Sequence, residues 1–475
     1  MTNASTNENT NANGRANESG RANANGRVAY QGECILTANH SRATDTWESG
    51  LNNNVLVLGC SGGGKTRHHL KPNLMQAHGS YIVLDTKGTL CREVGPYLQS
   101  QGYAVDCLDF TTMQGTVGYN PLDHVRRAGG KPMGQDMIAI ANAICPPTDA
   151  SSDPFWEHAA ANYLTSYIAY VFEALPENEQ TFSSVVSVFE SAGKGFTDGL
   201  FRRLEQRDFH SYAARLYNMA KTTANAEKMH SSIFGIIAAH LLPFSFEGVQ
   251  RCFEKPRRVD FASFGHEKRA LFVTLDDLDR SLAPLTGLFV HQALTALCDE
   301  ADRNCADGRL PVPVHLMLDD FANLYLPDFD NVLSVIRSRE ISATVICQTV
   351  SQLEAAYGQA AANSIIGNCD TQLVLAFQDA ATAEYFGVRA DRTASDLLET
   401  PAGKWWLFLR GKRGLCDDAY RLEGHPAYKA MRDARFVREA QPPVVLRGGG
   451  YEGCYDDLES FAFSEGLDDA LPFAS

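Results

Sequence analysis

Eight consecutive residues have the spacing of a phosphate-binding loop. The pattern, Gly, four residues and then Gly-Lys-Thr, is formed by Gly59, Cys60, Ser61, Gly62, Gly63, Gly64, Lys65 and Thr66. Glycines let backbone N–H groups surround phosphate oxygens without a Cβ in the way, and a following helix points its positive end at the same phosphates. Lys65 would then reach the β- and γ-phosphates, and the Thr66 hydroxyl would bind Mg²⁺. The alternative, a glycine-rich turn with a buried lysine, does not explain why Lys and Thr follow the last glycine together.

A second group of polar residues follows an apolar run far along the chain. The run Val314-His315-Leu316-Met317-Leu318 leads directly into Asp319 and Asp320. In the second motif of such nucleotide sites, Asp319 would hold the Mg²⁺ water shell opposite Thr66, and Asp320 would orient the water that attacks the γ-phosphate. The alternative is a pair of acids that cap the helix after a strand.

Two further residues are candidates for reading or completing the site. Gln348 ends the next expected strand, where a polar group beside the γ-phosphate would sense hydrolysis; a satisfied amide at a strand end is the alternative. Arg337 and Arg339 lie on the connection between these two strands. From there an arginine can reach the nucleotide of a neighbouring subunit and stabilise transition-state charge. An exposed arginine that caps helix carbonyls is the alternative.

The elements that must position these residues follow an α/β pattern. Strand–helix–strand alternation predicts a mostly parallel sheet with helices on both faces and ligands outside the carboxyl ends of the strands. The expected helices are 65–76, 284–303 and 329–337. The expected strands are 55–58, 81–84, 104–108, 270–275, 313–318, 343–347 and 372–377, with 405–409 as an edge strand.

The alternation is interrupted between residues 134 and 253. Apolar residues there recur at helical spacing, as at Trp156, Ala160, Tyr163 and Tyr167, and no clear strand run appears. We therefore predict a nucleotide-binding domain in two parts, 28–133 and 254–435, with an inserted all-α domain at 134–253. The aromatic stripe is more typical of a helical core than of a ligand site.

Composition limits the protein class. A chain of 475 residues, 44% of them apolar, allows about two to four domains. No stretch approaches the ~20 apolar residues that span a bilayer, and no signal peptide is visible, so we expect a cytoplasmic protein that meets the membrane through partners. The 12 cysteines include no Cys-x-x-Cys pair, which argues against a zinc module or a disulfide framework.

The two ends of the chain differ from the middle. Residues 1–27 repeat Gly-Arg every six residues between Asn and Ala, which predicts disorder. The C-terminal segment 436–475 is predicted to be an acidic tail, with seven acids and no Lys or Arg from Gly450 to Ser475. Phe461, Phe463 and Phe473 fit a docking segment that folds on binding, and a solubilising tail is the alternative.

The net charge of −15 gives no support for nucleic-acid binding. Small basic clusters occur at 202–203, 255–258 and 404–413, and each is more typical of a solvated face. If several of them lined the pore of a ring, they would contact phosphates of single- or double-stranded DNA without reading sequence.

These motifs together resemble the TraG-like and TraD-like coupling proteins of conjugation and type IV secretion, and in particular a subgroup from Gram-positive mobile elements. The similarity covers about residues 30–430. It is carried by Asn53–Gly59, Lys71–Met75, Tyr81–Gly88, Tyr119–Asp123, Phe155-Trp156, Asp319–Asn323, Gln348–Leu353 and Ile365–Thr371.

The resemblance implies a RecA-like P-loop NTPase domain, interrupted by an all-α domain, that uses ATP and Mg²⁺ and assembles as a ring, usually a hexamer. It implies delivery of relaxase-bound DNA or a protein substrate to a secretion channel at the inner face of the membrane. Lys65, Thr66, Asp319, Asp320 and Gln348 fall on the family's motif positions, and Arg337 falls on the position proposed for the arginine that acts in trans.

Two departures from the family pattern bear on function. Most members carry N-terminal transmembrane helices, which this sequence lacks, and the second acid is usually Glu where this chain has Asp320. The shorter side chain withdraws the carboxylate by one methylene, which suits slower hydrolysis. A nucleotide-gated docking platform with little hydrolysis is therefore one alternative function. A general DNA translocase is another, although the helical insertion argues against it.

Overall fold

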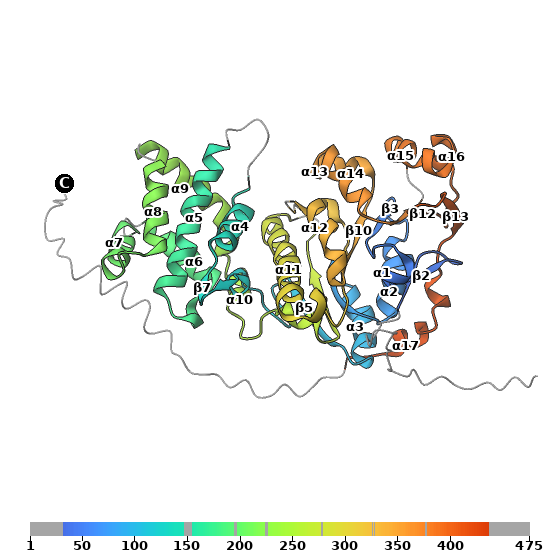
Figure 1. Cartoon of the computed structure of the whole chain (residues 1–475), viewed down its shortest axis with the longest axis horizontal. Helices are drawn as coiled ribbons and strands as arrows, with labels where there is room; N and C mark the ends of the chain where they lie inside the picture. The colour runs from blue at the N-terminus through green and yellow to red at the C-terminus, as the bar shows by residue number, and fades with distance from the viewer. Residues whose placement is uncertain are drawn as a thin grey trace, which may run out of the picture. The chain divides into compact units, whose positions relative to one another are not determined.

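The structure, a computed structural model, describes residues 32–436 except 147–153, 194–196, 224–226, 277–278, 325, 327 and 376–377 (Figure 1). The chain divides into two units, Met1–Arg435 and Phe436–Ser475. Every element below belongs to the first unit. The segment 1–27, predicted to be disordered, and the acidic tail, apart from Phe436, lie outside the described residues.

A largely parallel sheet forms the centre of the α/β region. Its order among the described residues is β13-β12-β11-β3-β10-β9-β4-β8-β5. The strands β3 to β5 and β8 to β11 run parallel, and β12 and β13 continue the sheet antiparallel beyond β11. The strand bounds are β3 Val55–Leu58, β4 Ser80–Asp85, β5 Ala104–Asp109, β8 Arg269–Thr274, β9 Val314–Leu318, β10 Ile341–Cys347, β11 Thr371–Leu375, β12 Lys404–Leu409 and β13 Leu415–Asp418.

The sheet confirms the predicted α/β class, and each expected strand is present with small differences in its ends. One expectation is wrong: the strand at 405–409 is not an edge strand, because β13 pairs with its outer side. The predicted last two residues of the strand at 372–377 lie outside the described residues.

Alternate residues of the central strands face two separate hydrophobic clusters, as the two-residue period of a strand requires. Val55 and Val57 join the cluster of α2 (Lys71–Met75), α3 (Leu90–Ser100) and α17 (Tyr428–Asp433). Leu56 and Leu58 join the cluster of the helices on the other face. Those helices are α11 Ala283–Asn304, α12 Phe329–Val335, α13 Val350–Tyr357, α14 Gln359–Gly367 and α15 Ala380–Ala390.

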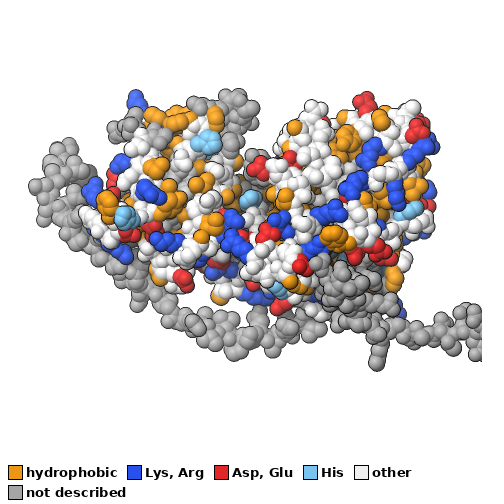
Figure 2. All heavy atoms as spheres, viewed as in Figure 1, with side chains coloured by type: hydrophobic (Ala, Val, Ile, Leu, Met, Phe, Trp, Pro, Cys, Tyr) orange, Lys and Arg blue, Asp and Glu red, His pale blue; other side chains and the backbone are white. Residues whose placement is uncertain are grey.

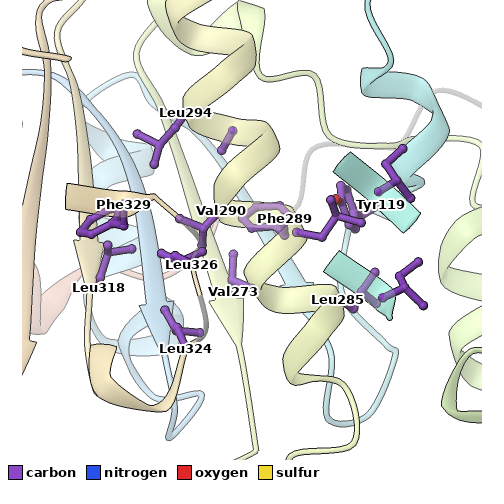
Figure 3. Packing of buried hydrophobic residues seen from close by; sticks show 14 of the residues in the cluster. Tyr119, Val273, Leu285, Phe289, Val290, Leu294, Leu318, Leu324, Leu326 and Phe329 are labelled. Atoms are coloured by element: carbon purple, nitrogen blue, oxygen red, sulfur yellow. The ribbon is translucent and has the colours of Figure 1, made fainter. Parts of the chain in front are cut away.

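Helix α11 supplies much of the packing on the second face. Figure 3 shows Phe289 and Val290 of α11 beside Val273 of β8, with Leu318 of β9 and Phe329 of α12 in the same layer. These five side chains are at most 2% exposed. Burying each such side chain contributes about 1.5–3 kcal/mol, so this layer holds the two strands that flank β4 in place.

The residues from 134 to 254 form helices and short 3-10 turns, and no strand occurs in the described part of this range. Figure 1 shows these helices gathered together (teal to green). The aromatic stripe on α5 is buried core, as predicted: Tyr163 and Tyr167 are fully buried, and Phe201 stacks on Tyr217 at 4.1 Å. The helices are α4 Gly134–Ile144, α5 Phe155–Ala174, α6 Phe182–Gly193, α7 Thr197–Arg207, α8 Tyr212–Thr223, α9 Glu227–Leu241 and α10 Glu247–Glu254.

The segment 119–123, which the sequence singled out without a role, joins the helical region to the α/β region. The Tyr119 hydroxyl donates to Gln292 Oε1 of α11 at 2.6 Å, and Gln292 Nε2 donates to the Pro121 carbonyl at 3.0 Å. Asn120 Oδ1 accepts from the backbone N–H of Phe182 at the start of α6 at 3.0 Å. These buried polar groups satisfy one another, so the segment acts as a joint between the two regions.

A second polar network ties the amino ends of β3, β10 and β11. Asn54 Oδ1 accepts from the Ala343 N–H at 3.0 Å, and its amide donates to the Asn368 carbonyl at 3.2 Å. Asn52 and Asp370 exchange bonds in both directions, from Asn52 N to Asp370 Oδ2 at 2.6 Å and from Asp370 N to Asn52 Oδ1 at 3.2 Å. Asn54 and Asp370 are at most 4% exposed. The asparagines and aspartate therefore replace backbone partners where three strands begin.

Within the described residues, no single helix is long and apolar enough to cross a membrane. Lys228–Ser245 and Glu247–Glu254 pass the same test of length and composition together, but they are bent by 73° at the break between them.

Candidate nucleotide site

The glycine-rich loop leaves the carboxyl end of β3 and curls before the next helix. Gly62 and Gly64 have φ of +77° and +87°, a region that side chains rarely adopt. The Gly59 N–H donates to the Cys347 carbonyl of β10 at 3.3 Å, and the Gly63 N–H donates back to the Cys60 carbonyl at 3.1 Å. The loop therefore has the tight curvature that a phosphate-binding loop needs.

Gly59 needs to be glycine for a different reason. Its backbone does not lie at positive φ, but a Cβ at this position would be 2.8 Å from Leu375 Cβ at the end of β11. Real Cβ atoms essentially never approach so closely. Contact with Leu375 therefore fixes where the loop leaves the sheet.

Lys65 lies within the curve of its own loop. The side chain is 8% exposed, and its ammonium donates to the carbonyls of Gly59 at 2.7 Å and Cys60 at 3.2 Å. Phosphate oxygens are stronger acceptors for an ammonium than these neutral carbonyls, because the bond is assisted by charge. The lysine is thus already inside the loop that would receive a phosphate.

Thr66 and Asp319 are far apart in sequence but are in contact in the folded chain. The Thr66 hydroxyl donates to Asp319 Oδ2 at 3.1 Å, although the residues are 253 positions apart in sequence. Burial, and then the negative charge of Asp320, raise the pKa of the Asp319 carboxyl. A hydroxyl beside a partly buried carboxylate supplies the hard oxygen ligands that suit Mg²⁺, so the residues fit the metal.

Asp320 has a strained backbone, and its side chain contacts the residue that follows β4. Its φ of +49° lies in the left-handed region, which costs of order 1–3 kcal/mol for a residue other than glycine. Thr86, directly after β4, donates its hydroxyl to Asp320 Oδ2 at 3.3 Å. Asp320 precedes the short turn Phe321–Asn323 but makes no side-chain capping bond to it. The helix-cap alternative therefore does not explain this acid.

A cavity of about 80 Å³, lined by both polar and apolar side chains, continues from the two acids between the ends of β4, β8 and β9. Its lining includes Thr86, Thr111 and Arg280, and the Arg280 guanidinium donates to Asn323 Oδ1 at 2.8 Å. The sequence analysis gave none of these three residues a role. Thr86 could have been found from its position one residue after a strand, whereas Arg280 follows a loop with no recognisable pattern.

Gln348 lies between the two halves of the site. It follows β10, which pairs with β3 on one side and β9 on the other, so it leaves the sheet between the loop and the two acids. Its backbone N–H donates to Gln352 Oε1 at 3.1 Å, and the Thr349 hydroxyl caps α13. This placement keeps Gln348 a candidate for sensing the γ-phosphate.

Arg337 lies at the opposite ends of the strands from the site, where β10 begins. Its guanidinium donates to the Thr46 carbonyl at 3.3 Å, and it precedes β10, whose length of seven residues separates it from Gln348 by about 20 Å. One copy of the chain therefore does not bring Arg337 to its own loop. Arg339 pairs with Asp302 at 2.8 Å.

The helix after the loop differs from the single helix expected at 65–76. Thr66–Leu70 form a wider π-helical turn, in which the Lys71 N–H donates to the Thr66 carbonyl, and α2 follows. Pro72 explains the change, because it lacks the N–H that would continue an α-helical ladder and its ring would crowd the preceding turn.

Side chains of this turn contact residues from the last part of the α/β region in sequence. His68 Nδ1 lies 2.7 Å from the Tyr420 carbonyl, and its ring meets Trp405 edge-on at 6.0 Å. Arg67 forms an ion pair with Glu423. The helix that begins at the site is thus tied to the segments on and after β12.

Most of the basic clusters are engaged in ion pairs. Arg257 pairs with Asp106 at 2.9 Å and Lys404 with Asp418 at 2.8 Å, while Arg258 and Arg413 each pair with an aspartate. On the face that Figure 2 presents, basic side chains (blue) stand in several separate groups with acidic ones (red) between them. This distribution favours a solvated surface over a continuous basic stripe.

Comparison with known proteins gives the same family for most of the chain. Residues 15–390 match the family described as Type IV secretory system Conjugative DNA transfer. Protein VirD4 of Rhizobium rhizogenes is 22% identical over 351 residues, which cover 70% of this chain and 48% of the relative. Protein VirD4 of Rhizobium radiobacter is also 22% identical, over 70% of this chain and 47% of its own length. The chain thus spans about half the length of these relatives.

Solved structures share the fold. The plasmid coupling protein TrwB in complex with the ATP analogue ADPNP superposes with a TM-score of 0.55 at 15% identity, over 79% of this chain and 86% of that one. TrwB in complex with ADP and Mg²⁺ gives a TM-score of 0.53 at 15% identity, over 78% and 85%. The fold class is therefore the RecA-like P-loop NTPase predicted above, and this chain belongs to the type IV secretory system conjugative DNA transfer family.

Proposed function

We propose that this chain is the ATP-hydrolysing motor of a conjugative or type IV secretion system. The observation that carries the proposal is the bond of 3.1 Å between the hydroxyl of Thr66, which ends the glycine-rich loop, and the carboxylate of Asp319, which follows β9. This contact joins the two halves of a Mg²⁺–nucleotide site. The TrwB complexes with an ATP analogue and with ADP and Mg²⁺ support this choice of ligands.

In this mechanism each residue has one task. Lys65 would bind the β- and γ-phosphates, and Thr66 with Asp319 would hold Mg²⁺, which when bound would supply positive charge to the transferred phosphoryl group. Asp320 accepts a hydrogen bond from the attacking water and orients it, and Gln348 detects the loss of the γ-phosphate. Arg337 of a neighbouring copy would complete the site, so hydrolysis would require a ring, for which we propose a hexamer.

The substrate would be a relaxase-bound DNA strand or a secreted protein that the motor passes to channel proteins. We place this work at the inner face of the cell membrane, reached through partners. Contact with DNA would be made with phosphates and without sequence specificity. The assignment to the Gram-positive subgroup stays a prediction.

The first test is ATP hydrolysis by the purified chain, measured with and without DNA while oligomer size is followed. Lys65→Ala should abolish the activity without changing the melting temperature. Lys71→Ala is the matched control, because Lys71 lies six residues further on and pairs with Glu93 of α3. Equal residual activity in the two variants would remove the loop from the mechanism.

A docking platform that binds nucleotide but hydrolyses little is the second candidate, favoured by Asp320 in place of the longer Glu. Asp320→Glu distinguishes the two functions. If the short carboxylate limits a working motor, the variant should hydrolyse ATP about 10-fold faster. If the chain is a platform, transfer should survive in a Lys65→Ala, Asp319→Ala strain.

A further inference from the structure

A second group of metal-ligating side chains lies where α11 ends and the chain enters β8. His266 follows the turn Ala262–Gly265, Glu300 lies in the last turns of α11, and Cys305 caps the C-terminus of that helix. One ligand atom from each of the three lies within 4.8 Å of the others. This cluster is at the amino edge of the sheet, away from the phosphate-binding loop.

Both oxygens of the Glu300 carboxylate have hydrogen-bond partners that hold the carboxylate in one orientation. His266 Nε2 lies 2.8 Å from Glu300 Oε1. Asn304, one helical turn further on, donates its amide to Glu300 Oε2 at 2.7 Å. The second carboxylate oxygen is therefore held by a neighbour, an arrangement that fixes metal-binding carboxylates in known sites.

Other acids on this part of α11 are neutralised in a different way. Asp299 pairs with Arg303 at 2.9 Å, and Asp302 pairs with Arg339 at 2.8 Å. Glu300 instead faces an imidazole and, nearby, a thiol. The C-terminus of a long helix also carries a partial negative charge, which favours a cation at this position.

We propose that His266, Glu300 and Cys305 bind a zinc ion. A nitrogen, an oxygen and a sulfur ligand together select zinc or a similar transition metal over Mg²⁺, which prefers oxygen alone. Three protein ligands leave the fourth tetrahedral position for water. Binding would break the contact between His266 and Glu300, and the proton of the Cys305 thiol would be released to solvent as the sulfur binds the ion.

Such an ion would clamp the end of α11 to the segment that enters β8. Helix α11 packs on the sheet along its length, so the clamp would stabilise the α/β core independently of nucleotide. This proposal does not rest on the proposed motor function, because it concerns ligands at the other edge of the sheet.

Zinc binding is tested on the full chain by competition with a chromophoric chelator, and Co²⁺ substitution reports the ligands. We expect one zinc per chain and a thiolate-to-cobalt charge-transfer band. Cys305→Ser should remove the band and weaken zinc binding at least 10-fold, as should His266→Ala. Asn304→Ala, which keeps all three ligands, should weaken zinc binding about 10-fold.

Two other cysteines provide matched controls. Cys298 lies on the same helix, and Cys416 is exposed on β13. Cys298→Ser and Cys416→Ser should keep both the zinc affinity and the cobalt band. Zinc should raise the melting temperature of the parent and of these controls but not of Cys305→Ser, whose melting temperature without metal should match the parent. Unchanged zinc affinity in Cys305→Ser, or equal losses in the control variants, would overturn the proposal.

Discussion

The two edges of the parallel sheet carry similar polar residues but hold them differently. At the carboxyl edge, Asp319 and Asp320 are adjacent like charges, and burial with this charge raises the pKa of the Asp319 carboxyl. At the amino edge, Asn54 and Asp370 are buried and bonded to the backbone of neighbouring strands. The two acids at the carboxyl edge therefore keep an electrostatic cost that a cation would relieve, whereas Asn54 and Asp370 at the amino edge already have hydrogen-bond partners within the chain.

This difference separates residues that serve a ligand from residues that serve the fold. Both edges would look alike in a sequence, since each places Asn or Asp next to an apolar run. The two kinds of residue are distinguished by the number of hydrogen-bond partners that each side chain has within the chain. Changes at Asp319 and Asp320 should alter chemistry, and changes at Asn54 and Asp370 should alter stability.

Arg337 tests the difference between the two edges most severely. It lies at the amino edge, but it is predicted to act in catalysis. Arg337→Ala should lower ATP hydrolysis by the assembled ring about 1,000-fold, the scale of an arginine supplied in trans. Arg339→Ala is the control, since that arginine pairs with Asp302. Equal activity of the two variants at matched oligomer size would return Arg337 to a structural role.

Asp319→Asn should act in opposite directions on activity and stability. Losing a metal ligand should lower hydrolysis at least about 100-fold, because bound metal supplies several kcal/mol of charge stabilisation. An acid whose pKa is raised by folding destabilises the fold at pH values above that pKa, so the variant should unfold at higher denaturant concentration without Mg²⁺ and nucleotide. Lower stability at neutral pH would contradict the electrostatic cost described for this edge.

Asn54→Ala should produce the converse pattern. Removing its amide leaves the Ala343 N–H without that partner, and the free energy of unfolding should fall by about 2 kcal/mol. Nucleotide affinity at low temperature should stay unchanged. Asn331→Ala, at an exposed site on α12, is the control for denaturant titration. A selective loss of nucleotide affinity would show that the amino edge is not purely structural.

Three histidines at the amino side of the sheet predict a weaker, pH-dependent effect. Burial lowers the pKa of His315 to about 3 and those of His69 and His78 to about 4. Between pH 6.5 and about 4 the unfolded chain binds protons that the folded chain does not, so stability falls as the pH falls. His315→Gln should reduce this slope by about 1 kcal/mol per pH unit.

The slope is measured by denaturant titration at several pH values, with exposed His210→Gln as the control. An identical slope in His315→Gln and the parent would mean that His315 is protonated in the folded chain.

The sequence predicted the parts of the molecule that depend on strong local patterns. Apolar runs that end in Asp or Gln located the central strands, and two separate motifs predicted the meeting of Thr66 and Asp319. The polar strand β13 carries no apolar run, so Trp405–Leu409 was placed wrongly at the edge. The π-helical turn before Pro72 was missed because helical periodicity does not reveal one wider turn.

Other features could not be predicted because their residues meet only after folding. The segment Tyr119–Asp123 was recognised as a motif, but its place as the joint with α11 depends on Gln292, far along the chain. Likewise His266 lies 34 positions before Glu300, whereas Glu300 and Cys305 lie together at the end of α11. The argument against a zinc module rested on closely spaced cysteine pairs, and such a search does not test a cluster of one His, one Glu and one Cys.

The contact between Gly59 and Leu375 has an evolutionary consequence. Gly62 and Gly64 are constrained by their own backbone angles and can be conserved one at a time. Gly59 is constrained by a side chain 316 positions later, so its identity depends on what the end of β11 carries. Because the contact is with the Cβ of Leu375, we expect position 59 to accept alanine among descendants of this chain only where position 375 has become glycine, and the two positions should therefore covary.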